Sequence, residues 1–149
     1  MSTWLFTWNP TRYPWNDRLT GYLTLKNQIS QVGSAFHTWS CGVNKSIITG
    51  DRIFLIRLGE EPRGIIASGY AATGVFESPH WNPERARNGE RSKRIYIEFD
   101  KILDVEKEKI LPLSELKHIA SDYCWSPQSS GINIPSHIAE EIEKHWIKL

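Results

Sequence analysis

Tryptophan stands out among the residues that could form a binding site, because this chain of 149 residues contains seven of them. An indole ring offers a flat face on which a planar ligand can stack, and its N–H needs a hydrogen-bond partner when it is buried. The seven are Trp4, Trp8, Trp15, Trp39, Trp81, Trp125 and Trp146. Several stand beside turn formers and not inside apolar runs, which suits a binding site, although a tryptophan-filled core is the plainer interpretation.

One tryptophan ends a short segment that is expected to be a strand. Trp39 is followed by Ser40, Cys41 and Gly42. A strand end lies at the rim of a sheet, so the Trp39 ring can face a ligand there. Ser40 and the backbone amides that follow it, including that of Cys41, can then donate hydrogen bonds. A core tryptophan followed by a polar turn explains the same pattern equally well.

Two further segments join a tryptophan to side chains that both donate and accept hydrogen bonds. Trp8 precedes Asn9, whose amide suits the edge of a nucleobase. In an Asn-Pro pair, however, a simple turn role for Asn9 is the stronger alternative. Trp125 opens a loop that contains Gln128 and Ser129, and this loop is either a reader of base edges or a solvent loop anchored by one buried ring.

A polar segment from Ser78 to Lys93 combines Trp81 with a cluster of positive charges. Its cations, together with the residue that follows it, are Arg85, Arg87, Arg91, Lys93 and Arg94. Such a segment can contact phosphates or enter a groove of nucleic acid. The usual role of a charge run is nevertheless that of a solvated loop.

Catalysis and cofactor binding find no support in the sequence. It contains no GxSxG, HExxH or Walker motif and no glycine-rich dinucleotide turn. Cys41 and Cys124 are far apart, and the five histidines are scattered without a metal-ligand spacing. We therefore expect a binding protein that does no chemistry and uses no metal or cofactor.

Composition narrows the class of protein further. The length fits one domain over residues 1–149. A formal net charge of +1 argues against unspecific binding of nucleic acid through many phosphate contacts, but it is compatible with a local cationic patch. No apolar run approaches the roughly 20 residues that span a bilayer, and the N-terminus is unlike a signal peptide. We expect a cytoplasmic protein with no membrane partner.

Local patterns predict strands in the middle of the chain and helices around them. Strands are expected over Thr3–Trp8, Phe36–Trp39, Arg52–Leu58, Ile65–Phe76 and Arg94–Leu103, helices over Leu19–Val32, Leu113–Ile119 and Pro135–Ile147, and loops over Ser78–Lys93 and Trp125–Ile134. Gly69 and Gly74 predict a bulge or a sharp corner. This order predicts an α+β fold, in which flanking helices surround a small, strongly bent β-sheet or barrel.

The order of these segments resembles the EVE domain, and the resemblance covers nearly the whole chain. It is carried by Trp8-Asn9, Trp39, the segment Gly50–Leu55 and the segment Arg63–Gly69. EVE domains belong to the PUA-like group, which also includes YTH and ASCH domains. The resemblance therefore implies a PUA-like fold.

The segment Trp125–Gly131 resembles the corresponding loop of EVE domains that are fused to HNH nucleases in modification-dependent restriction enzymes. There the domain reads 5-methylcytosine or 5-hydroxymethylcytosine in DNA by flipping the base out of the duplex. In the related YTH domains a tryptophan cage holds a methylated adenine, and Trp39 matches a cage position. The resemblance implies modified double-stranded DNA and an HNH nuclease domain as partners. This chain has no HNH motif of its own.

Site residues follow from these segments and from the resemblance. The expected base pocket comprises Trp8, Asn9, Trp39, Ser40, Cys41, Trp125, Gln128 and Ser129, and the expected backbone contacts are Arg12, Lys45, Trp81, Arg85, Arg87, Arg91 and Lys93. Two alternatives stay open. One is a reader of methylated RNA, and the other is a PUA-like module for a protein or small ligand with its tryptophans in the core. The reader hypothesis depends on a cavity beside Trp39.

Overall fold

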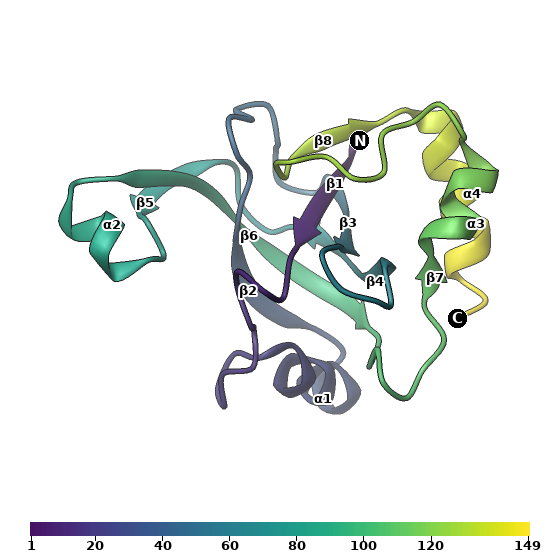
Figure 1. The fold of residues 1–149 in the computed structure, drawn as a ribbon, viewed down its shortest axis with the longest axis horizontal. Coiled ribbons are helices and arrows are strands. Elements are labelled where there is room, and N and C mark those ends of the chain that lie inside the picture. The colour runs from purple at the N-terminus through teal and green to yellow at the C-terminus, as the bar shows by residue number, and fades with distance from the viewer.

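A single, strongly curved β-sheet forms the frame of the protein. The computed structural model describes residues Met1 to Leu149. The strands are β1 (Thr3–Trp8), β2 (Ala35–Ser40), β3 (Arg52–Arg57), β4 (Gly64–Ala71), β5 (Phe76–Pro79), β6 (Arg91–Ile102), β7 (Leu111–Pro112) and β8 (Ile132–Ile134). The helices are α1 (Tyr22–Val32), α2 (Pro83–Arg87), α3 (Leu113–Ile119) and α4 (Ser136–Trp146). The strand order is β2-β6-β4-β3-β1-β8, with β5 beside β6 and β7 beside β4 (Figure 1). The α+β fold predicted from the sequence is confirmed.

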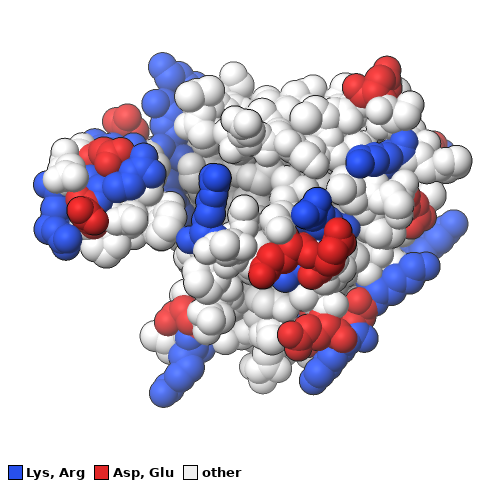
Figure 2. All heavy atoms as spheres, viewed as in Figure 1, with Lys and Arg blue, Asp and Glu red and all other residues white.

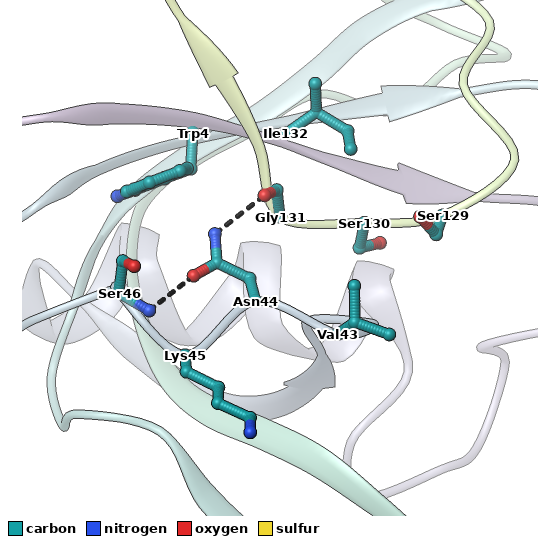
Figure 3. A pocket seen from close by; sticks show the side chains of 9 residues that line it. All are labelled: Trp4, Val43, Asn44, Lys45, Ser46, Ser129, Ser130, Gly131 and Ile132. Carbon is teal, nitrogen blue, oxygen red and sulfur yellow. Dashed lines mark hydrogen bonds between the residues drawn. The ribbon is translucent and has the colours of Figure 1, made fainter.

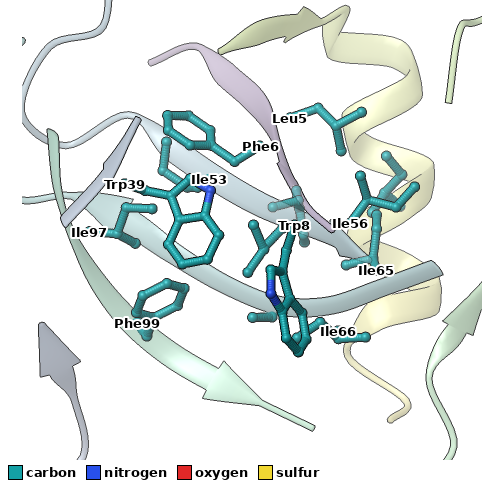
Figure 4. Close-up of a cluster of buried hydrophobic side chains, with 14 of the residues drawn as sticks. Leu5, Phe6, Trp8, Trp39, Ile53, Ile56, Ile65, Ile66, Ile97 and Phe99 are labelled. Atoms are coloured by element: carbon teal, nitrogen blue, oxygen red, sulfur yellow. The ribbon is translucent and has the colours of Figure 1, made fainter. Parts of the chain in front are cut away.

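β3 is covered on both faces, which explains why all six of its residues are buried. On one face, Phe54 packs against Trp146 of α4 with 6.1 Å between ring centroids. On the other face, Ile53 lies in the interior of the curved sheet near Trp39 (Figure 4). The continuous apolar run in the sequence indicated this central position.

Helix α4 is held against the sheet by a polar network as well as by its apolar face. Arg52 is buried and forms ion pairs with Asp100 of β6 at 3.0 Å and with Glu143 of α4 at 2.9 Å. The Trp146 indole N–H donates to the hydroxyl of Ser68 at 2.8 Å. The predicted amphipathic helix is confirmed, because Ile138, Ile142 and Trp146 are buried together with Ala139 on one face of α4.

An arm made of β5, α2 and the start of β6 extends from the body of the protein (Figure 1). The prediction of a loop over Ser78–Lys93 is wrong, because Phe76–Pro79 pairs with Arg91–Arg94 as a hairpin. Helix α2 begins after Asn82, whose side-chain oxygen accepts hydrogen bonds from the backbone N–H groups of Glu84 and Arg85. The high proportion of polar residues concealed these short elements.

The remaining differences from the predicted elements are local. The strand expected over Ile65–Phe76 is two strands, since β4 ends at Ala71 and β5 begins at Phe76. The bulge predicted at Gly69 is confirmed, because the register of β4 against β6 shifts between Ser68 and Gly69. The expected loop over Trp125–Ile134 ends in β8, which pairs with β1. None of the helices has the length and apolar character needed to cross a bilayer.

Candidate nucleic-acid interface

The ends of β1 and β2 come together where Thr7, Trp39 and Ser130 meet, and we call this place the seam. β1 and β2 are not neighbours in the sheet, so their ends are joined by side chains. The Trp39 indole N–H donates to the carbonyl of Thr7 at 2.9 Å. The Thr7 backbone N–H donates to the Ser130 hydroxyl at 2.9 Å. The seam therefore brings together segments that the sequence analysis expected to form one site.

Two loops are locked together beside the seam. The Asn44 side-chain amide donates to the carbonyl of Gly131 at 2.7 Å, and its oxygen accepts the backbone N–H of Ser46 at 2.6 Å (Figure 3). Gly131 has a φ of +82°, and a Cβ atom there would lie 2.8 Å from the carbonyl oxygen of Cys41. Glycine at this position is thus required by the close approach of the two loops.

A hollow of about 380 Å³ adjoins these loops (Figure 3). Its lining residues are Trp4, Val43, Asn44, Lys45, Ser46, Ser129, Ser130, Gly131 and Ile132. Trp4 is its one aromatic ring, and the Trp4 indole N–H donates to Asp51 at 2.9 Å. Lys45, Ser46 and Ser129 are exposed around it. Serine hydroxyls, backbone groups and an ammonium group suit the sugar and phosphate of a nucleotide better than they suit an enclosed base.

A series of aromatic rings leads from the surface to the seam. Trp81, on the arm, is 50% exposed, and its ring centroid lies 6.0 Å from that of Tyr13. The Tyr13 ring in turn lies 5.5 Å from that of Trp39 in an edge-on arrangement. Trp39 itself is only 6% exposed. We call Trp81, Tyr13 and Trp39 the aromatic series.

His37 of β2 accompanies this series in an uncharged form. The Tyr13 hydroxyl and His37 Nε2 are hydrogen-bonded at 3.1 Å. Burial, followed by the positive charge of Arg94, lowers the pKa of His37 to about 4. Burial also raises the pKa of Tyr13. At neutral pH the hydrogen bond therefore joins two neutral groups.

Acidification from about pH 6.5 to about pH 4 should destabilise the protein through His37. In this window the unfolded chain binds a proton that the folded state excludes, so the free energy of unfolding falls as the pH falls. Because the ring is partly exposed, we expect a loss of about 1–2 kcal/mol. Urea titrations across the window measure it, with His37→Gln as the control. The free energy of unfolding of the His37→Gln variant should depend less steeply on pH than that of wild type. An equally steep dependence would contradict His37 as the cause of the destabilisation.

The tryptophans assigned to the base pocket are buried. Trp8 is 3% exposed, Trp39 6% and Trp125 2%, and Figure 4 shows Trp8 and Trp39 among apolar core side chains. The indole N–H of Trp8 donates to the carbonyl of Tyr13 at 2.6 Å, and that of Trp125 donates to Ala120 at 3.0 Å.

The expectation that these tryptophan rings present open faces to solvent is wrong. Trp39 does not line the hollow of about 380 Å³ either, so that hollow is not the cavity that was expected beside Trp39. The segment after β1 folds over Trp8 and Trp39, because Tyr13 supplies the acceptor of Trp8 and packs against Trp39, whereas Trp125 is covered by its own neighbour Tyr123.

Two of the expected polar groups are also engaged within the protein. The Asn9 oxygen accepts the backbone N–H of Thr11 at 3.0 Å, and the Asn9 side chain fills the space beside Gly59. Asn9 is thus a turn residue and not an open reader of base edges. Cys41 is buried, its thiol donates to the carbonyl of Asn44 at 3.6 Å, and burial raises its pKa.

Three expected pocket residues keep accessible polar groups. Gln128 and Ser129 are exposed, and Ser40 is half-buried at the end of β2. Ser129 borders both the hollow and Gly42, where an added Cβ atom would lie 3.3 Å from it. These groups are the polar part of the predicted pocket that a ligand can reach.

The expected backbone cations divide into paired and unpaired groups. Arg85 forms an ion pair with Glu90 at 2.8 Å, which neutralises much of its charge, and Figure 2 shows blue and red atoms intermixed on the arm. Arg87, Arg91 and Lys93 make no ion pair. Arg12 and Lys45 are exposed outside the arm. No group of three or more histidine, cysteine, aspartate or glutamate residues is placed to bind a metal ion.

Sequence reasoning missed Tyr13, Trp4 and Asn44. Alternation along Thr3–Trp8 places Trp4 on the same face of β1 as Phe6 and Trp8, and this signal could have linked Trp4 to the predicted pocket residue Trp8. Tyr13 stands in a segment without regular structure, and its contacts with Trp39 and Trp81 are all long-range. No local pattern in the sequence marks it.

Comparisons with known proteins identify the fold. No protein-family model and no curated protein sequence matches the chain. A hypothetical protein from Leishmania major is similar in structure, with a TM-score of 0.68, 14% identity and coverage of 99% of this chain and 96% of that one. Human THYN1, in complex with 5-methylcytosine-containing DNA, has a TM-score of 0.63 and 14% identity, covering 97% of each chain. ASCH from Zymomonas mobilis has a TM-score of 0.54 and 11% identity, covering 96% of this chain and 94% of that one. The fold is PUA-like.

Proposed function

We propose that this chain binds double-stranded DNA that carries 5-methylcytosine or 5-hydroxymethylcytosine and holds the modified base out of the duplex at the seam. The observation that carries the proposal is the aromatic series, which leads from exposed Trp81 through Tyr13 to Trp39. Extruding a base costs a few kcal/mol, and stacking on aromatic rings returns about 1–3 kcal/mol per base. The shared fold of THYN1, whose structure contains 5-methylcytosine DNA, supports this choice of ligand.

Polar groups on both sides of the seam suit the sugar-phosphate backbone. Lys45 and Ser129 border the hollow, and Arg87 and Lys93 lie on the arm. With a net charge of +1, affinity must come from these few local contacts. Each neutralised phosphate contributes about one counterion to the salt dependence of binding, so the salt dependence should be modest.

A restriction role extends the proposal. The resemblance to EVE domains of modification-dependent restriction enzymes supports a recognition function, with cleavage carried out by an HNH nuclease as partner. The accessible groups around the seam are hydroxyls, an amide, an ammonium group and aromatic rings, which bind and orient a ligand. In this proposal the chain selects the DNA and does no chemistry itself.

The affinity for matched duplexes tests the proposal. We expect a duplex with a single 5-methylcytosine or 5-hydroxymethylcytosine to bind about 10- to 200-fold more tightly than the same unmodified duplex, which is the range that one small group in a fitted pocket provides. Fluorescence anisotropy measures both affinities, with methylated RNA as a third ligand. Equal affinity for the modified and unmodified duplexes would refute the proposal. Preference for methylated RNA would favour the YTH-like alternative.

Burial of most of the indoles favours a second candidate function, a PUA-like module for a protein or small ligand. Trp8, Trp15, Trp39, Trp125 and Trp146 are each no more than 6% exposed. In that case the aromatic rings would be core, and oligonucleotides would leave the tryptophan fluorescence unchanged. Quenching by modified DNA would instead support the reader function.

A further inference from the structure

We propose that Tyr13 is a plug: in the free protein its ring packs edge-on against Trp39 and occupies the space in which a nucleobase would stack, and it moves aside when a nucleobase enters. The inference rests on the proposed function, because it concerns the same site. The plug explains why the Trp39 ring, at the seam, is only 6% exposed in the free protein. The base would occupy the space that the tyrosine ring vacates.

The Tyr13 ring is the contact between the two tryptophans of the aromatic series. Tyr13 lies against both Trp39 and Trp81, with centroid distances of 5.5 and 6.0 Å, whereas these two tryptophans do not pack against each other. Trp39 is also covered by Trp15 at 4.7 Å, but Trp15 is 1% exposed and belongs to the core. Tyr13 is half-buried, so it is the cover that can leave without opening the core.

Tyr13 is held more firmly by its backbone than by its side chain. Its backbone is fixed, since its N–H donates to the carbonyl of Asn9 at 3.0 Å and its carbonyl accepts the Trp8 indole N–H at 2.6 Å. Its side chain has one hydrogen bond, between the hydroxyl and His37 Nε2. A change of side-chain rotamer can therefore swing the ring away while the backbone stays in place.

His37 would give the entering base a hydrogen-bond partner. When the Tyr13 hydroxyl leaves, His37 Nε2 loses its partner at the edge of the vacated space. Leaving this half-buried ring nitrogen without a hydrogen-bond partner costs free energy, so a new partner in place of the Tyr13 hydroxyl is favourable. The edge of a base can serve, because it carries both donors and acceptors. His37 is held in place by stacking on Trp15, with a centroid distance of 6.0 Å and an interplanar angle of 12°. The base would thus replace both contacts of Tyr13, with the tryptophans and with His37.

Two substitutions of Tyr13 in the full chain test the plug. Tyr13→Ala removes the competing ring and should bind the 5-methylcytosine duplex about 10-fold more tightly than wild type. Tyr13→Phe keeps the packing but loses the bond to His37, and it should bind about 3-fold more tightly. Tyr96→Ala is the matched control, because Tyr96 is 44% exposed on β6, and it should leave the affinity unchanged.

The outcomes separate the two proposals. Tighter binding by both Tyr13 variants supports the plug. If wild type prefers modified DNA but the variants bind no more tightly, Tyr13 is a wall of the site and the plug is overturned. If wild type does not prefer modified DNA, the proposed function fails and the plug fails with it. Should Tyr13→Ala not fold, as judged by its circular dichroism, Tyr13→Phe decides the matter alone.

Discussion

Replacing Trp15 with alanine should lower the free energy of unfolding by about 3–5 kcal/mol, the usual cost of truncating a buried large aromatic residue. Trp15 is 1% exposed and packs edge-on against Trp39 at 4.7 Å and Trp8 at 5.3 Å. Its indole N–H donates to the carbonyl of Thr20 at 2.7 Å. The ring therefore holds the segment after β1 closed over the core. Urea denaturation followed by circular dichroism measures the loss.

Trp81→Ala provides the control for this experiment. The Trp81 side chain is 50% exposed, so its removal should change the free energy of unfolding by less than about 0.5 kcal/mol. A loss below about 1 kcal/mol for Trp15→Ala would show that this ring does not close the core. The comparison thus separates a tryptophan that builds the fold, Trp15, from the half-exposed Trp81.

The same Trp81→Ala substitution should weaken binding to the modified duplex by about 10- to 100-fold. Trp81 begins the aromatic series, and an aromatic side chain that stacks on a base contributes about 1–3 kcal/mol. Because the fold is expected to tolerate the change, the loss would report on binding alone. Fluorescence anisotropy with the 5-methylcytosine duplex measures it.

Phe36→Ala is the matched control for binding. Phe36 is 49% exposed on β2, close to the exposure of Trp81, and it lies outside the aromatic series. It should leave the affinity for DNA within about 2-fold of wild type. Equal losses from both substitutions would argue that exposed aromatic rings act unspecifically and that Trp81 has no special position.

Elements with a strong local pattern were predictable from the sequence. The alternation in β6 and the four-residue spacing of Ile138, Ile142 and Trp146 each report which face is buried, and burial is what fixes those elements. The arm was not predictable as a hairpin. The two strands of the arm are short and polar, and α2 separates them in the sequence. They are defined by the backbone hydrogen bonds between them and not by a buried apolar face, so their side chains carry no periodic signal.

The site was predictable in its segments but not in its open surfaces. The sequence motifs predicted that Trp39 and the segment after Trp125 belong to one site. In the structure both are hydrogen-bonded to Thr7 at the seam, Trp39 through its indole N–H and the segment through Ser130. The exposure of a given indole depends on which residues pack over it, and those residues come from segments that are distant in the sequence. Trp39 is covered by Trp15 and Tyr13, and neither contact leaves a periodic signal in the sequence.

Fluorine NMR of the chain labelled with fluorotryptophan, titrated with a duplex that carries one 5-methylcytosine, tests most directly whether a modified base enters the seam. Substitution of single tryptophans by phenylalanine assigns the resonances. We expect those of Trp39 and Trp81 to shift with the modified duplex and to stay in place with the unmodified one. The resonance of Trp146, which is buried between α4 and the sheet, should stay constant. A Trp39 resonance that is unmoved at saturation, or that moves equally with both duplexes, would contradict the account.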